Sequence, residues 1–260
     1  MGGALLGGLL NSQWADAGAI GVVEPSAARR HELAREYSGI EVFEAPEVGL
    51  LGEGGDRLAG AVLAVKPDEA EGACRVLGAV GVRRVLSVVA GIPSSRLEAA
   101  LGGQPNVVRA MPNSPALVGA GVTAISGGSF ATSADLAWAE DVMSAVGTVV
   151  RLPERLLDPV TGLSGSGPAY FFLVAEALIE AGVQMGLARD TSRTLVVETM
   201  LGSAKLLAES GQDPEALRAM VTSPAGTTAA GIRTLESRAV RSAFMEAVAS
   251  ATERSRSLQR

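Results

Sequence analysis

Residues 58–67 read LAGAVLAVKP, an uninterrupted apolar run that ends in Lys66 and Pro67. A strand with one face in solvent alternates apolar and polar residues, whereas a run that is apolar throughout indicates a strand buried on both faces. Strands of that kind are typical of parallel sheets covered by helices. The stretch therefore predicts a buried strand followed by a turn at its carboxyl end.

Five further runs of this kind occur in the first half of the chain, at residues 20–24, 85–90, 107–110, 122–126 and 148–152. Helical stretches separate them, such as residues 26–37, where Ser26 is the expected N-cap. This repetition predicts a doubly wound, Rossmann-like α/β domain with a parallel sheet. Ligands of such domains bind beyond the carboxyl ends of the strands, where Lys-Pro, Gly-Ile-Pro and Met-Pro-Asn-Ser-Pro segments fall.

The predicted secondary structure changes after Pro153, where strand patterns end. Four helical stretches follow, at residues 169–186, 190–210, 214–221 and 228–257. We therefore predict two domains, a dinucleotide-binding domain over residues 1–153 and an all-α domain over 154–260. The charged tail TERSRSLQR, residues 252–260, is expected to fray.

Composition excludes several classes of protein. The chain of 260 residues is 47% hydrophobic, carries a net charge of −6 and has only 3% aromatic residues, which argues against nucleic-acid binding. No run of 18 apolar residues lacks a charge, so we expect no membrane insertion. Cys74 is the sole cysteine and His31 the sole histidine, in a charged helical stretch. We expect a cytoplasmic protein with no disulfide, no metal site and no histidine-based catalysis.

Two segments of the second half stand out. LSGSGPAY, residues 163–170, has the pattern of a helix junction that needs close backbone approach. VTSPAGTTAAG, residues 221–231, gathers four hydroxyls and several free amides directly before a helix, which suits a small carboxylate. Taken alone, this segment fits an elaborate N-cap equally well.

Three motifs in their order and spacing resemble the pyrroline-5-carboxylate reductase family: MPNSPALVGAGVTAI (111–125), LSGSGPAYFF (163–172) and VTSPAGTTAAGI (221–232). The resemblance covers essentially the whole chain. It implies NAD(P)H-dependent reduction of 1-pyrroline-5-carboxylate to proline, the last step of proline biosynthesis. It also implies a Rossmann domain and a helical domain that interlocks two subunits, with homodimers often assembling into decamers.

The resemblance also explains the opening MGGALLGGLL. In this family a first strand enters a glycine-rich turn, followed by Met-Gly and a helix that begins Ala-Leu, and residues 1–5 match the end of that turn. We expect the first strand and the first fingerprint glycines to be absent from this chain, leaving a gap in the sheet, and the true start codon to lie upstream. Gly2 then matches the last fingerprint glycine, and Glu24, 22 positions later, matches the acidic residue that binds the ribose.

The resemblance assigns roles to individual positions. Thr228 matches the catalytic threonine, which is proposed to hydrogen-bond the ring nitrogen of the substrate. Ala225 stands where many relatives have glycine. The expected substrate-binding residues are Ser223, Gly226, Thr227 and Thr228, and the expected cofactor-binding residues are Met1, Gly2, Glu24, Ala64, Val65, Lys66, Pro67, Ala90, Gly91, Met111 and Asn113.

The cofactor is expected to be NADPH or NADH. Glu24 would bind a ribose hydroxyl pair and favour NADH, whereas Arg29 and Arg30 follow closely and keep NADPH open.

Two alternatives stay open. A β-hydroxyacid dehydrogenase would need a catalytic lysine on the helix after the domain boundary, where this chain offers Glu176, Glu180 and Gln184. The other alternative is a truncated, catalytically impaired family member that serves only as an oligomerising chain.

Overall fold

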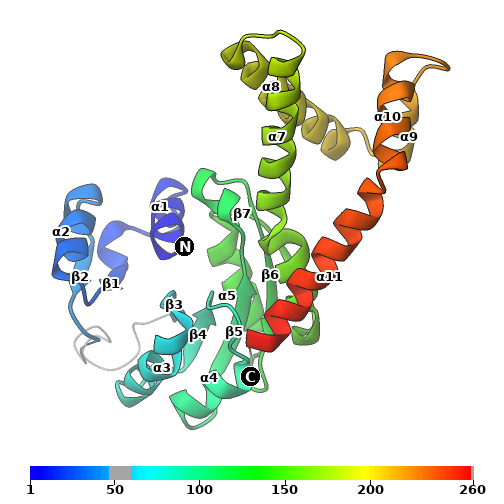
Figure 1. The fold of residues 1–260 in the computed structure, drawn as a ribbon. Helices are drawn as coiled ribbons and strands as arrows, with labels where there is room; N and C mark the ends of the chain where they lie inside the picture. The colour runs from blue at the N-terminus through cyan, green and yellow to red at the C-terminus, as the bar shows by residue number, and fades with distance from the viewer. Residues whose placement is uncertain (47–59, 259–260) are drawn as a thin grey trace. The chain divides into compact units, whose positions relative to one another are not determined.

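The fold was analysed in a computed structural model that describes residues 1–46 and 60–258. The chain divides into two compact units, of which the first comprises Met1–Gly165 together with the end of the chain from Ala251, and the second comprises Ser166–Ser250. The boundary at residue 153 remains a prediction from the change in sequence pattern. Figure 1 shows the elements of both units.

The first unit contains a five-stranded sheet in the order β3-β4-β5-β6-β7. Its strands are β3 (Ala61–Leu63), β4 (Arg84–Ser87), β5 (Asn106–Met111), β6 (Gly121–Gly127) and β7 (Gly147–Arg151). Among the described residues, β1 (Gly21–Val23) and β2 (Glu41–Phe43) pair with each other in a separate parallel sheet. The β1–β2 pair and the five-stranded sheet thus form two separate sheets, where the sequence predicts one sheet with a gap.

All six predicted strands occur, although residues 58 and 59 of the first run lie outside the described residues. Strand β2 was not predicted, because three residues between a turn and Glu44 carry too short a pattern. The sheet is parallel apart from one pairing, in which β6 runs antiparallel to β5. The connection over residues 112–120 is too short for the crossover that a parallel pair requires.

Helices cover both faces of the five-stranded sheet. Val85 and Val107 point into one core with Leu97 of α4, whereas their neighbours Leu86 and Val108 point into the other. This alternation confirms the doubly covered sheet that the uninterrupted apolar runs predict. The covering helices are α1 (Gly2–Asn11), α3 (Ala70–Ala79), α4 (Ser94–Leu101) and α5 (Ser133–Ser144), while α2 (Ala27–Glu36) follows β1.

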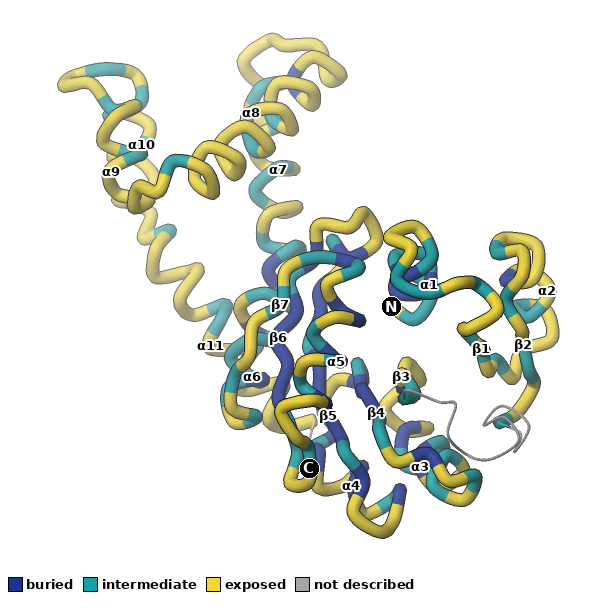
Figure 2. The backbone as a smooth tube through the Cα atoms, turned by 180° about the vertical axis from the view of Figure 1, so that it is seen from behind, coloured by how far each residue is buried: buried dark blue, intermediate teal, exposed yellow. Residues whose placement is uncertain are grey.

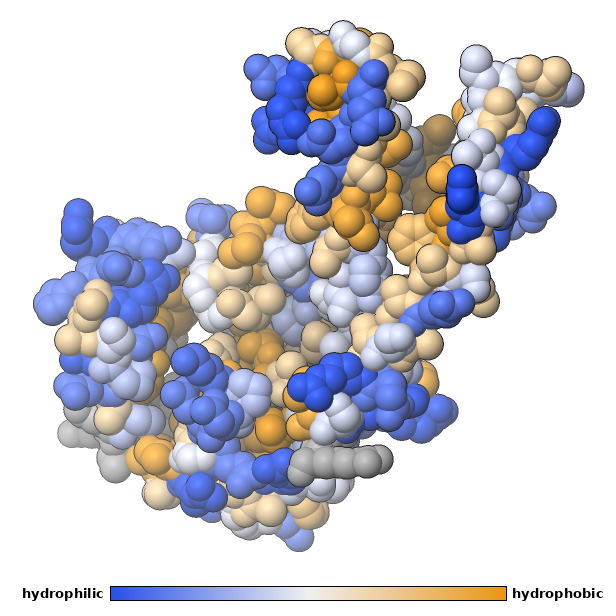
Figure 3. All heavy atoms as spheres, viewed as in Figure 1, coloured by the Kyte–Doolittle hydropathy of each residue, from blue (hydrophilic) through white to orange (hydrophobic). Residues whose placement is uncertain are grey.

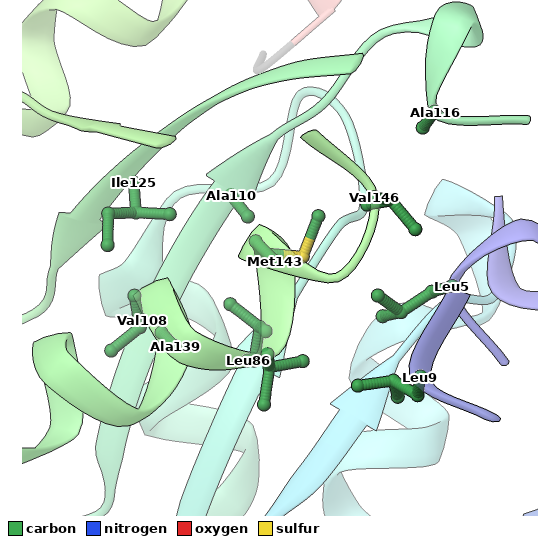
Figure 4. Close-up of a cluster of buried hydrophobic side chains, with 11 residues drawn as sticks. Leu5, Leu9, Leu86, Val108, Ala110, Ala116, Ile125, Ala139, Met143 and Val146 are labelled. Carbon is green, nitrogen blue, oxygen red and sulfur yellow. The ribbon is translucent and has the colours of Figure 1, made fainter. Parts of the chain in front are cut away.

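The opening stretch forms α1, which packs directly on the sheet. Figure 4 shows Leu5 and Leu9 extending from α1 toward Leu86 and Val146, in a cluster of buried side chains. A methyl group added at Gly8 would clash with Val146 and lie 2.9 Å from the carbonyl oxygen of Ala145. The small residues of MGGALLGGLL thus allow the helix backbone to approach the core closely.

The second unit is entirely helical, with α7 (Gly167–Gln184), α8 (Arg189–Glu209), α9 (Pro214–Met220), α10 (Thr227–Ser237) and the greater part of α11 (Val240–Leu258). The prediction of a single helix over residues 228–257 is wrong, because the chain breaks after α10. Ala239 adopts a positive φ of 54° there, although it has the side chain of a strong helix former. Neither glycine nor proline marks this stop, so the residue types here do not predict a helix end.

The end of α11 belongs to the first unit, and the expected fraying is wrong as far as Leu258. Thr252 and Ser255 are buried, and the Ser255 hydroxyl donates a hydrogen bond of 2.7 Å to Asp158 Oδ1. Small polar residues on one face of a charged helix let it pack where the sequence alone indicates a solvated tail.

The second unit has little core of its own. In Figure 2 the central strands of the first unit are largely buried, whereas α8, α9 and α10 are mostly exposed. Hydrophobic side chains lie along α7 in Figure 3. The exposed apolar residues of α7 and α8 include Phe171, Phe172, Leu173, Leu178, Leu195 and Leu201. Such a surface marks an interaction site.

Candidate active site

The carboxyl ends of three parallel strands form the candidate cofactor edge. Strands β3, β4 and β5 run parallel, with Leu63 in register with Ser87. The Val88 amide donates to the Leu63 carbonyl at 3.0 Å. The ends of these strands and the segments that leave them therefore meet at one edge. They carry the predicted cofactor residues Ala64, Val65, Lys66, Pro67, Ala90, Gly91, Met111 and Asn113.

The start of α1 reaches this same edge. A methyl group added at Gly2 would lie 3.2 Å from Cβ of Ala64, so a glycine allows the helix to approach β3 closely. Met1 is the N-cap and no side chain caps the first turn, which leaves its amide groups for an anion. This close approach and this donor set fit the pyrophosphate of a dinucleotide.

Glu24 lies where β1 ends. Its amide donates to the carbonyl of Phe43 at 2.9 Å, which extends the pairing of β1 with β2 by one residue. Its carboxylate oxygen Oε1 accepts a hydrogen bond of 2.9 Å from the amide of Ser26. Ser26 is the N-cap of α2, as the sequence predicts, and its hydroxyl accepts from the amide of Arg29. A carboxylate is thus fixed at the strand end.

Asn113 has a role that its motif did not reveal. Its side chain is only 9% exposed, with Oδ1 accepting from the Val122 amide at 2.9 Å and Nδ2 donating to the Ser164 carbonyl at 3.2 Å. Close by, a methyl group added at Gly165 would lie 2.8 Å from Cε of Met111. The Met-Pro-Asn-Ser-Pro and Leu-Ser-Gly-Ser-Gly segments therefore contact each other within the first unit.

The structure shows a charged cluster that the sequence analysis missed, which joins β5 to the start of α4 and to the segment after β7. Arg109, in the middle of β5, donates to Glu154 Oε1 at 2.7 Å, and the amide and hydroxyl of Ser94 donate to the same carboxylate at 2.7 and 2.6 Å. Burial by itself would raise the pKa of Glu154, but the bonds from Ser94 and Arg109 outweigh it and lower the pKa below its ordinary value. In the sequence, the charge of Arg109 inside the otherwise apolar run VVRAM is the one signal of this cluster.

The predicted substrate segment forms a tight turn in the second unit. The Gly226 amide donates to the Ser223 carbonyl at 3.1 Å, and Ala225, the third residue of the turn, has a φ of 60°. These are the features of a type II turn, in which the third position favours glycine. A methyl group added at Gly226 would clash with Oγ of Ser223, so the Ser223 hydroxyl would have to turn away.

Helix α10 begins directly after the turn. Gly226 is its N-cap and supplies no capping side chain. The first-turn residues Thr227 and Thr228 therefore present their amides and hydroxyls together with the exposed hydroxyl of Ser223. All four predicted substrate residues lie within one helix start, a donor-rich arrangement that suits a carboxylate.

The acidic residues of α7 lie near arginines of α8. Glu180 pairs with Arg189 of α8 at 2.7 Å, and Glu176 lines a shallow groove between the two helices with Arg189 and Arg193.

His31 is exposed, with Nδ1 2.8 Å from the Ala27 carbonyl oxygen. Cys74 is buried, which together with the nearby Glu71 raises the pKa of its thiol to about 11. Within residues 1–46 and 60–258, no three His, Cys, Asp or Glu side chains group to hold a metal.

The fold and the edge define a class of protein, a dinucleotide-dependent oxidoreductase with a Rossmann-like unit and a helical unit. The family model described as "Pyrroline-5-carboxylate reductase dimerisation" matches residues 154–258. The pyrroline-5-carboxylate reductase of Synechocystis is 42% identical over 91% of this chain and 86% of its own length. The chain belongs to the pyrroline-5-carboxylate reductase family.

Solved structures of the family share the fold. A pyrroline-5-carboxylate reductase from Coxiella burnetii superposes with a TM-score of 0.90 at 34% identity, covering 100% of this chain and 95% of the other. The Plasmodium falciparum pyrroline carboxylate reductase with NADP bound has a TM-score of 0.85 at 29% identity and covers the same shares. The family uses NAD(P)H, and residues Gly2, Ala64 and Glu24 fit such a cofactor.

The family match also accounts for the exposed apolar helices. The helical stretch of residues 154–184 is long and apolar enough to cross a membrane by length and composition alone, and 11% of that window is buried. One such helix is weak evidence for a span, and the same residues lie in the region matched by the dimerisation model. The dimerisation match supports a homo-oligomer formed through this region of the chain.

Proposed function

We propose that this chain catalyses the reduction of 1-pyrroline-5-carboxylate to L-proline, with a hydride from NADPH or NADH added at the C=N bond. The observation that carries the proposal is the turn over residues 223–226 and the uncapped start of α10, which together gather hydroxyl and amide donors. Family membership supplies the reaction that such a carboxylate site serves.

Within this proposal, Ser223, Gly226, Thr227 and Thr228 hold the substrate carboxylate through amides and hydroxyls. Thr228 also hydrogen-bonds the ring nitrogen of the substrate through its hydroxyl and is the catalytic residue. The imine binds already protonated at nitrogen and reduced nicotinamide supplies the hydride to the adjacent carbon, so the protein needs little acid–base machinery. The chain's task is to orient the imine and to stabilise the charge distribution of the transition state.

The proposed cofactor residues act from the strand edge. The first-turn amides of α1, with Met1 and Gly2, hold the pyrophosphate, and Glu24 holds the ribose of the adenosine half. The segments that follow β3, β4 and β5 hold the remainder through backbone groups. They comprise Ala64, Val65, Lys66 and Pro67, then Ala90 and Gly91, and then Met111 and Asn113.

The test is an assay of reduced-nicotinamide oxidation with 1-pyrroline-5-carboxylate. We expect activity in the wild type, and a loss of about 10- to 100-fold in kcat/KM for Thr228→Val, because the hydroxyl is lost while the volume is kept. Thr228→Ser keeps the hydroxyl and serves as the matched control. An inactive but folded and oligomeric wild type would instead support the alternative of a chain that only oligomerises.

Further parts of the proposal concern the surroundings of the enzyme. We propose a homodimer that assembles further, up to a decamer, and that works in the cytoplasm on a small imino acid. Its negative net charge and low aromatic content support the absence of nucleic-acid partners. The dimerisation match over residues 154–258 supports burial of the apolar helix against another protein copy, away from membrane.

A further inference from the structure

We infer that Glu24 makes this chain prefer a dinucleotide without a 2′-phosphate to one that carries it. Its carboxylate is fixed at the carboxyl end of β1, and the nearby Arg29 and Arg30 are engaged in other contacts. NADH is then favoured over NADPH. This inference rests on the proposed function, because it concerns the ribose end of the same dinucleotide site.

The first step is the position of the Glu24 carboxylate. It follows the last residue of β1, and its Oε1 is held by the Ser26 amide at 2.9 Å, so the side chain is oriented before any ligand arrives. Its second carboxylate oxygen takes no part in that bond. An acidic residue about 20 positions after the fingerprint glycine accepts hydrogen bonds from ribose hydroxyls. A phosphate dianion at the same hydroxyl would face a fixed negative charge.

The second step is the state of Arg30, the arginine of α2 whose guanidinium contacts the backbone of Glu24. One of its amino groups donates to the backbone carbonyls of Glu24 and Pro25, at 2.9 and 2.8 Å. The other donates to Glu44 Oε2 at 3.2 Å. Its guanidinium therefore holds the end of β1 in place. To bind a 2′-phosphate, Arg30 would have to give up these three acceptors.

The third step is the direction in which Arg29 extends. A methyl group added at Gly3 would lie 3.4 Å from an amino group of Arg29, so this guanidinium reaches toward the first turn of α1. That turn is the proposed pyrophosphate site. Arg29 is also paired with Glu32 at 2.8 Å. Its position favours a contact with the pyrophosphate and leaves the ribose to Glu24.

The experiment measures binding of two fragments by calorimetry, ADP-ribose and 2′-phospho-ADP-ribose, to the full chain and without substrate. We expect ADP-ribose to bind at least 10-fold more tightly to the wild type. Glu24→Gln keeps the size and one acceptor but removes the charge, and it should bring the two affinities within about 3-fold. Circular dichroism and the oligomeric state check that the variant is folded.

Glu32→Gln is the matched control, because it removes a carboxylate of the same helix and releases Arg29. It should leave the affinity ratio of the two fragments unchanged. Equal or tighter binding of 2′-phospho-ADP-ribose by the wild type would overturn the preference, as would an unchanged ratio in Glu24→Gln. A selective increase in the affinity of Glu32→Gln for 2′-phospho-ADP-ribose would assign Arg29 to the ribose and contradict its contact with the pyrophosphate.

The experiment distinguishes the existence of the dinucleotide site from its preference between the two fragments. If both fragments bind and only their order differs from expectation, the dinucleotide site stands and the preference is wrong. If neither fragment binds to the folded chain, the dinucleotide site itself fails, and the proposed function and the preference fail with it.

Discussion

The Asn113 side chain donates from Nδ2 to the carbonyl oxygen of Ser164 at 3.2 Å, so two motifs 51 positions apart are tied together in one unit. Its Oδ1 also accepts from the Val122 amide at 2.9 Å. A buried amide with both ends engaged fixes the loop that follows β5. The segment that carries Met111 at the cofactor edge therefore depends on a contact with the Leu-Ser-Gly-Ser-Gly stretch.

We expect Asn113→Ala to lower the free energy of unfolding by about 2 kcal/mol, because it leaves a buried amide and a carbonyl without partners. Asn113→Asp keeps an acceptor for Val122 but cannot donate to Ser164 when ionised, so it should also destabilise. Denaturant unfolding measures both changes. Ser114→Ala, at the exposed next position, is the control and should change stability by less than about 0.5 kcal/mol.

Acid should weaken the contacts of Glu154. Its pKa is lowered in the folded protein, so its contribution to stability is complete above the ordinary carboxyl pKa of about 4.3 and is lost as the pH falls through the lowered value. Glu154→Gln should cost roughly 1 kcal/mol at neutral pH and flatten the fall in stability below pH 5.

The measurement is denaturant unfolding of the wild type and Glu154→Gln at a series of pH values. Glu140→Gln is the control, because Glu140 pairs with Arg151 on the surface and should contribute little. Parallel stability curves for the wild type and Glu154→Gln would contradict the assignment of the lowered pKa.

Ala225→Gly should stabilise the second unit by about 1 kcal/mol. An L-residue at a φ of 60° carries strain that glycine avoids, and this relief exceeds the entropy that glycine loses on folding. The same change at Ala230, in the interior of α10, should destabilise by about 1 kcal/mol. Thermal and denaturant unfolding distinguish the two, and a destabilised Ala225→Gly would show that the alanine is not strained.

Charges on the exposed apolar helices should break the oligomer. Phe172 of α7 is 68% exposed and Leu201 of α8 is 63% exposed within the single chain. Burying a glutamate at either position without a partner is costly, so Phe172→Glu with Leu201→Glu should shift the protein to monomers in analytical ultracentrifugation. Gln212→Glu, on the exposed α8–α9 connection, should sediment as the wild type does. An intact oligomer in the double variant would place the interface elsewhere.

The sequence determined the strands and the class of fold, because an uninterrupted apolar run such as residues 85–90 needs a sheet covered on both faces. The Ser26 cap and the family motifs could also be predicted from local residue types. The role of Thr228 remains a prediction, since family motifs indicate it and no structural contact tests it.

Other features could be recognised in the three-dimensional structure alone, since each depends on contacts between residues that are far apart in the chain or on a local energy balance. The pairing of Arg109 with Glu154 and the contact of Asn113 with Ser164 join residues that are far apart in the chain. Ala225 and Ala239 adopt the αL conformation although alanine prefers a negative φ. Packing and hydrogen bonding around a turn can outweigh the roughly 1 kcal/mol that an alanine loses in this conformation.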